Sequence, residues 1–544
     1  MLLFVGSIFT CFLATAFADP IISIKQGQLN GTVLKSRNGK PFFAFYGIPY
    51  AEPPVGKFRF APPHKAPTWE GLRNAIEKAP ACIQPQNFID PKPKLNGSED
   101  CLYLSVFTPE INNSSKLLPV MVYIHGGAYF TGSGDKGANF LMDKPIVVVT
   151  MNYRHGILGF LSSNDAIIPG NYALKDQVAA LRWIKSNIAS FGGDPNAVTI
   201  LGQSSGSTCV HLHTMSPLSK GLFHRAIMQS GSALSYWSHY DPRYAKRSFD
   251  DVMKKVNCTQ NTTLEILHCL RQLPAEDLIQ AEQHFRAEKR IVMKFRPVIE
   301  KRRVKNAFMT VSPRKLNYQN ISVPWIMGFN SAEGMMDAIW FLSKSESQKK
   351  RMNKELNAVM PLFLHYKYFS RKENVANITT ALKKFYFKNG NFNETEQQQL
   401  CNLISDIVFG MPSLQAAYAY PGPKYFYYYD FVTNSSAADI GKIFFNTSKK
   451  YDIKGAVHSD EMDLLFVGRR ARNLREEQKP LSEKLIAYWT NFIITGNPNS
   501  EDLPVWNQLQ PDTGDYLHIT NDRIEMEKGL LRDRYELWKN INNL

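Results

Sequence analysis

Apolar and polar positions follow two periods along the chain, one typical of buried strands and one of helices. Residues 118–124 (LPVMVYI) and 145–151 (PIVVVTM) are almost continuously apolar, as in central strands buried on both faces. The shorter apolar runs 197–201 and 323–329 also predict strands. Within 172–190, apolar residues fall on one face of a predicted helix. Buried strands that alternate with helices predict an α/β fold with a largely parallel sheet.

Flanking segments predict additions to this sheet. Residues 21–34 and 42–49 have the short alternating runs of a small antiparallel meander. The polar, helical pattern of residues 242–290 is expected to form a cap over the active site. The 544 residues are 44% hydrophobic, without a compositional break, which favours a single domain over 19–544 with insertions.

The first 18 residues predict an exported protein. Residues 1–18 are apolar and end in Ala16-Phe17-Ala18, so we expect a signal peptide, although no basic residue precedes the apolar run. The alternative, a membrane anchor, is disfavoured because the run is short and Asp19-Pro20 follows at once. No later stretch predicts a membrane span. N-glycans are expected, because sequons occur at Asn30, Asn96, Asn112, Asn113, Asn257, Asn261, Asn320, Asn377, Asn393, Asn434 and Asn446.

Cysteine positions agree with an oxidising compartment. Four cysteines bracket two polar loops, and we expect pairs in chain order, Cys82 with Cys101 and Cys258 with Cys269. Cys209 is predicted to be a buried free thiol, and Cys401 has no obvious partner.

The formal net charge of +16 predicts a basic surface. No aromatic-interleaved basic groove or nucleic-acid motif accompanies the charge, so no nucleic-acid partner is expected. Attraction to acidic extracellular surfaces is the alternative interpretation.

The segment 202–206 (GQSSG) carries the candidate nucleophile. It fits G-x-S-x-G between a predicted strand and a predicted helix, the nucleophile elbow of α/β-hydrolases. Glycines permit the tight turn that exposes the Ser204 hydroxyl. Upstream, Gly127 and Ala128 follow a strand in a stretch with little side chain. With Ser205 they are expected to supply the N–H groups of an oxyanion hole, although a plain Gly-Gly turn is the alternative.

A serine nucleophile requires a histidine base and a carboxylate, in the chain order Ser, acid, His. Glu333 follows a predicted strand in a loop of small residues, where a solvated glutamate would be the alternative. His458 lies in a similar loop. His365 and His518 lie in helical and strand-like contexts and are predicted to be structural. These residues predict ester hydrolysis through an acyl-enzyme, with no metal or organic cofactor.

The chain resembles the type-B carboxylesterases along essentially its whole mature length. The segments 191–206, 99–104 and 488–498 are similar to three motifs of that family. The resemblance implies an α/β-hydrolase fold with helical cap insertions, a Ser204–His458–Glu333 triad and the two disulfides. It also implies an ion pair between Arg59 and Glu99, and support of the acid by Ser230.

Departures from the family pattern narrow the subtype. Cholinesterases have a glutamate beside the nucleophile and a tryptophan in the first disulfide loop, whereas this chain has Gln203 and no such tryptophan. By resemblance, the substrate pocket includes Gln203, Trp237, Ile291, Met293 and Phe295. Its aliphatic members predict room for a longer or branched acyl group.

Three alternatives and several questions stay open. Gln203 and the Asp176-Gln177 pair resemble juvenile hormone esterases, so hydrolysis of a hormone, pheromone or odorant ester is a possible subtype. A non-catalytic, cholinesterase-like adhesion or binding protein is the alternative from another class, and an interfacial lipase is the third. The sequence leaves the natural substrate, the glycan occupancy and the oligomeric state open.

Overall fold

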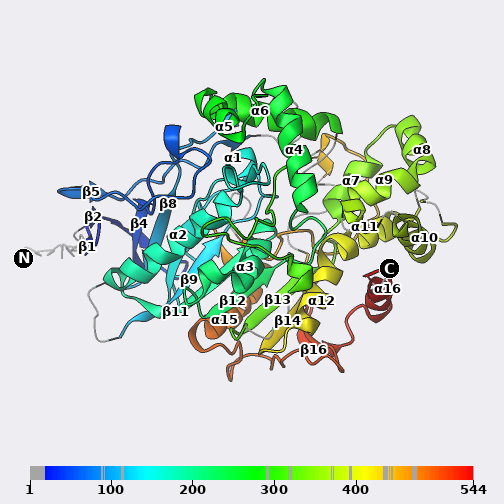
Figure 1. Cartoon of the computed structure of the whole chain (residues 1–544). Helices are drawn as coiled ribbons and strands as arrows, with labels where there is room; N and C mark the ends of the chain where they lie inside the picture. The colour runs from blue at the N-terminus through cyan, green and yellow to red at the C-terminus, as the bar shows by residue number, and fades with distance from the viewer. Residues whose placement is uncertain are drawn as a thin grey trace, which may run out of the picture.

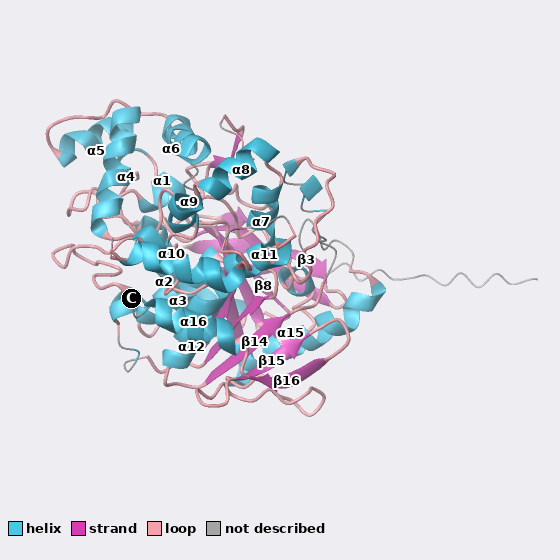
Figure 2. Ribbon diagram, turned by 90° about the vertical axis from the view of Figure 1, so that its right-hand side faces the viewer, coloured by secondary structure: helices cyan, strands magenta, loops and turns pink. Residues whose placement is uncertain are grey.

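An eleven-stranded mixed sheet runs through the computed structural model, with helices on both faces (Figures 1 and 2). The structure describes residues 19–542 except 87–89, 91, 112–115, 290–292, 317, 319–320, 369, 372, 391, 393–394, 433–438, 440, 443–444 and 468–473. In spatial order, the strands are β16 (Ile524–Lys528), β15 (Asp515–Ile519), β14 (Lys424–Tyr429), β13 (Trp325–Asn330), β12 (Arg225–Gln229), β11 (Gly193–Gln203), β9 (Leu118–Ile124), β10 (Val147–Met151), β8 (Tyr103–Thr108), β4 (Pro41–Pro49) and β3 (Thr32–Lys35).

The strands from β10 to β15 are parallel, and the strands at both edges are antiparallel. All parallel neighbours therefore end at the same edge of the sheet, the usual place for a site in such a fold. The predicted α/β class with an α/β-hydrolase architecture is confirmed.

The sheet is buried on both faces at its centre, where all five residues of β10 and six of the seven residues of β9 are buried. In β9, Val120 and Val122 belong to the apolar cluster that also contains residues of α2 and α3, while Met121 and Tyr123 belong to the cluster that contains residues of α15.

The helices are α1 (Gly156–Phe160), α2 (Tyr172–Asn187), α3 (Ser205–Met215), α4 (Pro242–Lys255), α5 (Thr263–Gln272), α6 (Ala275–Lys289), α7 (Met335–Leu342), α8 (Glu346–Lys354), α9 (Leu356–Phe363), α10 (Asn374–Tyr386), α11 (Gln397–Ser405), α12 (Met411–Ala419), α14 (Met462–Leu465), α15 (Lys479–Thr495) and α16 (Arg532–Asn542).

The expected N-terminal meander is wrong in one respect. Strands β1 (Ile21–Ile24) and β2 (Gly27–Asn30) form a separate small sheet with β5 (Leu72–Asn74), whereas β3 joins the main sheet through β4. The chain passes between the sheets at Gly31, where an added Cβ would lie 2.6 Å from the Phe45 ring. The close approach of the Phe45 ring favours glycine at this crossover point. Two further short strands, β6 (Gln84–Pro85) and β7 (Leu95–Asn96), pair with each other.

Helices α4, α5 and α6 lie together at one end of the molecule, and α7 to α10 form a neighbouring group (Figure 1). The first group occupies the segment that was expected to be a helical insertion. Across the described ranges, no helix combines the length and the apolar character that a bilayer span needs.

Candidate active site

Ser204 lies in a strained turn between β11 and α3. Its backbone has φ 58° and ψ −125°, a conformation that L-residues rarely adopt. The turn needs glycine on both sides, because a Cβ at Gly206 would lie 2.1 Å from the Ile124 carbonyl oxygen, and one at Gly202 would lie 2.3 Å from the Gly206 carbonyl oxygen. The Ser204 N–H donates to the Gln229 carbonyl at 2.8 Å. The hydroxyl is thus held at the carboxyl edge of the sheet.

Ser204, His458 and Glu333 form a continuous chain of hydrogen bonds. His458 Nε2 lies 2.9 Å from Ser204 Oγ, and His458 Nδ1 bonds to Glu333 Oε2. The other Glu333 oxygen accepts the Asn330 N–H at 2.8 Å. Glu333 is buried, whereas the His458 side chain is 16% exposed. A buried carboxylate that bonds Nδ1 leaves Nε2 as the proton acceptor for the hydroxyl.

Carboxyl groups offset the effect of burial on His458. Burial lowers the pKa of this imidazole, but the charges of Glu333, Glu461 and Asp337 and the Glu333 hydrogen bond raise it, and the pKa ends above its usual value. Burial, and then the charge of Glu333, raises the pKa of Glu461 to about 8. Burial likewise raises the pKa of Asp337 to about 6. The surroundings of His458 therefore stabilise its protonated, imidazolium form.

The loop after β9 lies directly against the nucleophile. An added Cβ at Gly126 would come within 2.9 Å of Ser204 Cβ, and Gly127 and Ala128 have φ of 122° and 52°. The N–H groups of these last two residues donate to no other described residue. The Ser205 N–H precedes the first hydrogen bond of α3, which runs from Thr208 to Ser204. This geometry leaves three amides available to an anion.

Aromatic rings connect this loop to the histidine. Trp237 packs against Tyr129 and Phe409, with ring centroids 5.9 and 5.7 Å apart, and its Nε1 donates to the Val408 carbonyl at 2.7 Å. Phe409 lies 4.6 Å from the His458 ring. Phe409 was not predicted, because it belongs to a π-helical turn, Asp406–Gly410, which no local sequence pattern marked.

Of the other residues predicted to line the substrate pocket, one contacts the catalytic histidine, two lie in or against the apolar core and one lies outside the described residues. Gln203 Nε2 lies 3.2 Å from His458 Nε2 and donates to Ser459 Oγ at 2.6 Å. Phe295 is buried and Met293 is partly buried against the same core cluster, whereas Ile291 lies outside the described residues.

Ser230 does not bond to the acid. It lies at the end of β12 with φ 58°, and its hydroxyl has no hydrogen-bond partner among the described residues. Ser230 therefore does not support Glu333 by a hydrogen bond. The backbone N–H of Asn330 donates to that carboxylate instead. His518 bonds to Glu527 at 2.8 Å in the β15–β16 pair, away from Ser204. His365 lies just after α9.

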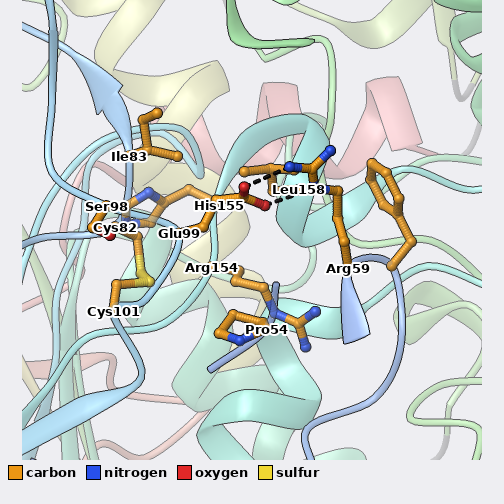
Figure 3. A pocket seen from close by; sticks show the side chains of 11 residues that line it. Pro54, Arg59, Cys82, Ile83, Ser98, Glu99, Cys101, Arg154, His155 and Leu158 are labelled. Carbon is orange, nitrogen blue, oxygen red and sulfur yellow. Dashed lines mark hydrogen bonds and ion pairs between the residues drawn. A yellow bond between two sulfur atoms is a disulfide. The ribbon is translucent and has the colours of Figure 1, made fainter. Parts of the chain in front are cut away.

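A small pocket next to the first disulfide is separate from these residues (Figure 3). Arg59 forms a bidentate pair with Glu99, with contacts of 2.7 and 2.5 Å, and also donates to the Leu270 and Leu273 carbonyls. The Arg59–Glu99 pair thus fastens the first disulfide loop to the cap. Disulfides join Cys82 to Cys101 and Cys258 to Cys269, and the free thiols of Cys209 and Cys401 are buried.

The described side chains include no cluster of three or more histidine, cysteine or carboxylate residues arranged to hold a metal ion. The chemistry that the site can perform follows from its own groups: a hydroxyl, an imidazole, a buried carboxylate and adjacent free amides. Together they can deliver an oxygen nucleophile to a carbonyl carbon and stabilise the resulting oxyanion.

Comparisons with known proteins agree along the full length. The model of the carboxylesterase family matches residues 18–538. A carboxylic ester hydrolase from Bombus ignitus is 34% identical, over 96% of this chain and 94% of that protein. Venom carboxylesterase-6 from Apis mellifera is also 34% identical, over 99% and 97%. The crystal structure of juvenile hormone esterase from Manduca sexta, with OTFP covalently attached, superposes with a TM-score of 0.85 at 26% identity, over 97% of this chain and 100% of that one.

Proposed function

The chain belongs to the carboxylesterase family and is a carboxylic ester hydrolase, and from this premise we propose that it is a secreted serine esterase with a Ser204–His458–Glu333 triad. The observation that carries the proposal is the hydrogen-bond chain from Ser204 Oγ through His458 to Glu333. The three residues come from distant parts of the sequence and meet at the edge of the sheet where the parallel strands end.

The proposed reaction has two halves. Ser204 Oγ attacks the ester carbonyl while its proton passes to His458 Nε2, and the N–H groups of Gly127, Ala128 and Ser205 hold the oxyanion. His458 then gives this proton to the alcohol that leaves, and an acyl-enzyme remains. Water attacks the acyl-enzyme by the same route and releases the acid. Glu333 stabilises the imidazolium in both halves.

Turnover of a p-nitrophenyl ester by the purified protein tests the proposal. Ser204→Ala should abolish turnover and covalent labelling by an organophosphate without loss of fold, because only the attacking oxygen is removed. Ser207→Ala is the matched control, since Ser207 lies in the first turn of α3, next to the elbow, and its buried hydroxyl donates to the Gly231 carbonyl. The Ser207→Ala variant should keep both ester turnover and covalent labelling by the organophosphate. Labelling of Ser204→Ala at another serine would contradict the assignment, and a folded wild-type protein without turnover would favour the binding-protein alternative.

Secretion is supported by two disulfides and by a similar venom protein. Residues 1–18, the expected signal peptide, lie outside the described residues. Expression in insect cells should release a protein that begins at Asp19, with a mass that falls on treatment with an N-glycosidase. Retention of the protein in the membrane fraction with residues 1–18 intact would contradict the proposal.

Within the carboxylic esters, a hormone or odorant ester is a candidate substrate, and the similarity to a juvenile hormone esterase structure favours it. Trp237 and Phe409 give the site aromatic walls, and the partly buried Met293 side chain is flexible. Matched acetate, butyrate and hexanoate esters, together with a terpenoid methyl ester, test the pocket. We expect kcat/KM to rise with acyl length, and fastest turnover of acetate would refute the proposed pocket.

A further inference from the structure

Asn330 connects the strand that precedes Glu333 to the loop that carries His458. It is the last residue of β13 and is fully buried. Its backbone N–H donates to Glu333 Oε1 at 2.8 Å, and its Nδ2 donates to the Val457 carbonyl at 2.7 Å. Val457 directly precedes His458 in the chain. One residue thus contacts both segments that must stay aligned for the His458–Glu333 bond.

The same side chain also holds a second buried carboxyl group. Asn330 Nδ2 donates to Glu461 Oε2 at 2.7 Å, and the charges of Glu333 and His458 both act on Glu461. Of the two glutamates, Glu333 is the one that bonds to His458 Nδ1. The bond to Asn330 fixes the Glu461 carboxyl group, while His458 Nδ1 bonds to Glu333.

A primary amide suits this position because it presents two N–H donors to two acceptors. An alanine would leave the Val457 carbonyl and Glu461 Oε2 without this donor in a buried place. An aspartate would keep the shape but supply an acceptor where a donor is needed, and it would add a third carboxyl group beside Glu333 and Glu461.

We propose that Asn330 is a positioning residue of the esterase, which sets His458 against Glu333 and reserves Nδ1 for that carboxylate. This inference rests on the triad proposed above. Asn330 acts through its neighbours, since its amide bonds to Val457 and Glu461 and its backbone to Glu333. Small displacements in such a site are costly, because a misplacement of about 1 Å lowers a rate about 10²-fold.

Asn330→Ala and the isosteric Asn330→Asp test the proposal. We expect kcat per titrated active site to fall about 10- to 100-fold, with KM changed by less than about threefold, because alignment rather than binding is lost. In Asn330→Ala, the acid limb of the kcat/KM profile should move to lower pH, since a looser Glu333 raises the pKa of His458 less. In Asn330→Asp, the added carboxyl group opposes this shift, so the readout of that variant is kcat per titrated site. Asn330→Asp serves as the second variant if Asn330→Ala does not fold.

Ser331→Ala is the matched control. Ser331 Oγ accepts the Ala456 N–H at 2.8 Å, so it joins the same two loops but bonds neither Glu333 nor Glu461. This variant should lose thermal stability, keep kcat per titrated site within about threefold and leave the acid limb in place.

The possible results separate the two proposals. An active wild-type protein whose Asn330 variants keep kcat per site and the acid limb would overturn the positioning role alone. Equal losses in Ser331→Ala would overturn it too, because loop attachment would then explain the effect. A folded wild-type protein that neither turns over esters nor labels at Ser204 would instead overturn the proposed function.

Discussion

Replacement of Glu333 by glutamine is the most direct test of how the site activates Ser204. Glutamine keeps the size of the side chain and can accept a hydrogen bond from His458 Nδ1, but it carries no charge. Burial is the largest influence on the pKa of His458 and lowers it, and the charge of Glu333 is the main influence that opposes burial. With glutamine, burial prevails, so the pKa of His458 falls and the imidazolium formed during attack loses its counter-charge.

The expected size of the effect follows from that lost attraction. Two unit charges about 4 Å apart attract by about 4 kcal/mol at an effective dielectric constant of about 20. If the whole of this attraction stabilises the transition state, its loss in Glu333→Gln lowers the rate about 10³-fold, since about 1.4 kcal/mol corresponds to a tenfold change in rate. Glu333 and His458 are in direct contact and Glu333 is fully buried, so screening by solvent is small.

The assay is single-turnover release of p-nitrophenol from a butyrate ester, normalised to titrated active sites. Asp337→Asn is the matched control, because Asp337 also raises the pKa of His458 by its charge. We expect the control to lose less than about tenfold, since a charge without a direct bond is more strongly screened. Glu333→Gln with more than a tenth of wild-type activity would refute this reasoning.

Three further predictions address pH, the elbow and the covalent links. Activity should be lost as the pH falls through the raised pKa of His458, so the acid limb of kcat/KM should lie above 6.5, and a limb below this value would contradict the proposed carboxylate effect. Gly206→Ala should cost about 1–3 kcal/mol and most activity, because its Cβ would meet the Ile124 carbonyl at 2.1 Å, and an unchanged Tm would contradict this. Removal of the Cys82–Cys101 disulfide by a double serine substitution should destabilise the protein by about 3 kcal/mol in denaturant unfolding, and an unchanged midpoint would refute this.

Local sequence patterns predicted the central elements well. The apolar run 118–124 has the same bounds as β9, and the run 197–201 lies within β11. These elements were predictable because a strand buried on both faces must be apolar at every position, whatever its neighbours are. The strand predicted at 323–329 starts two residues too early and ends one residue too early, since β13 covers Trp325–Asn330. Pro324 cannot donate a ladder hydrogen bond, which agrees with the later start.

Other features depend on contacts between distant segments. The N-terminal strands divide between two sheets on either side of Gly31, and Phe409 reaches His458 from a π-helical turn. Ser230 was expected to support Glu333, yet Asn330 makes that bond through its backbone. A backbone donor has no signature in the sequence, because every residue except proline carries an N–H group.

The sequence by itself determined the α/β class, the strand-turn-helix around Ser204 and the residue types that the chemistry needs. Each of these follows from neighbours within a few positions, through periodic burial or the freedom of glycine at a tight turn. Only the tertiary structure decided the distances from His458 to Ser204 and to Glu333, and the central place of Asn330. Those distances are set by strand order and by bonds across more than 100 residues, and no local pattern encodes them.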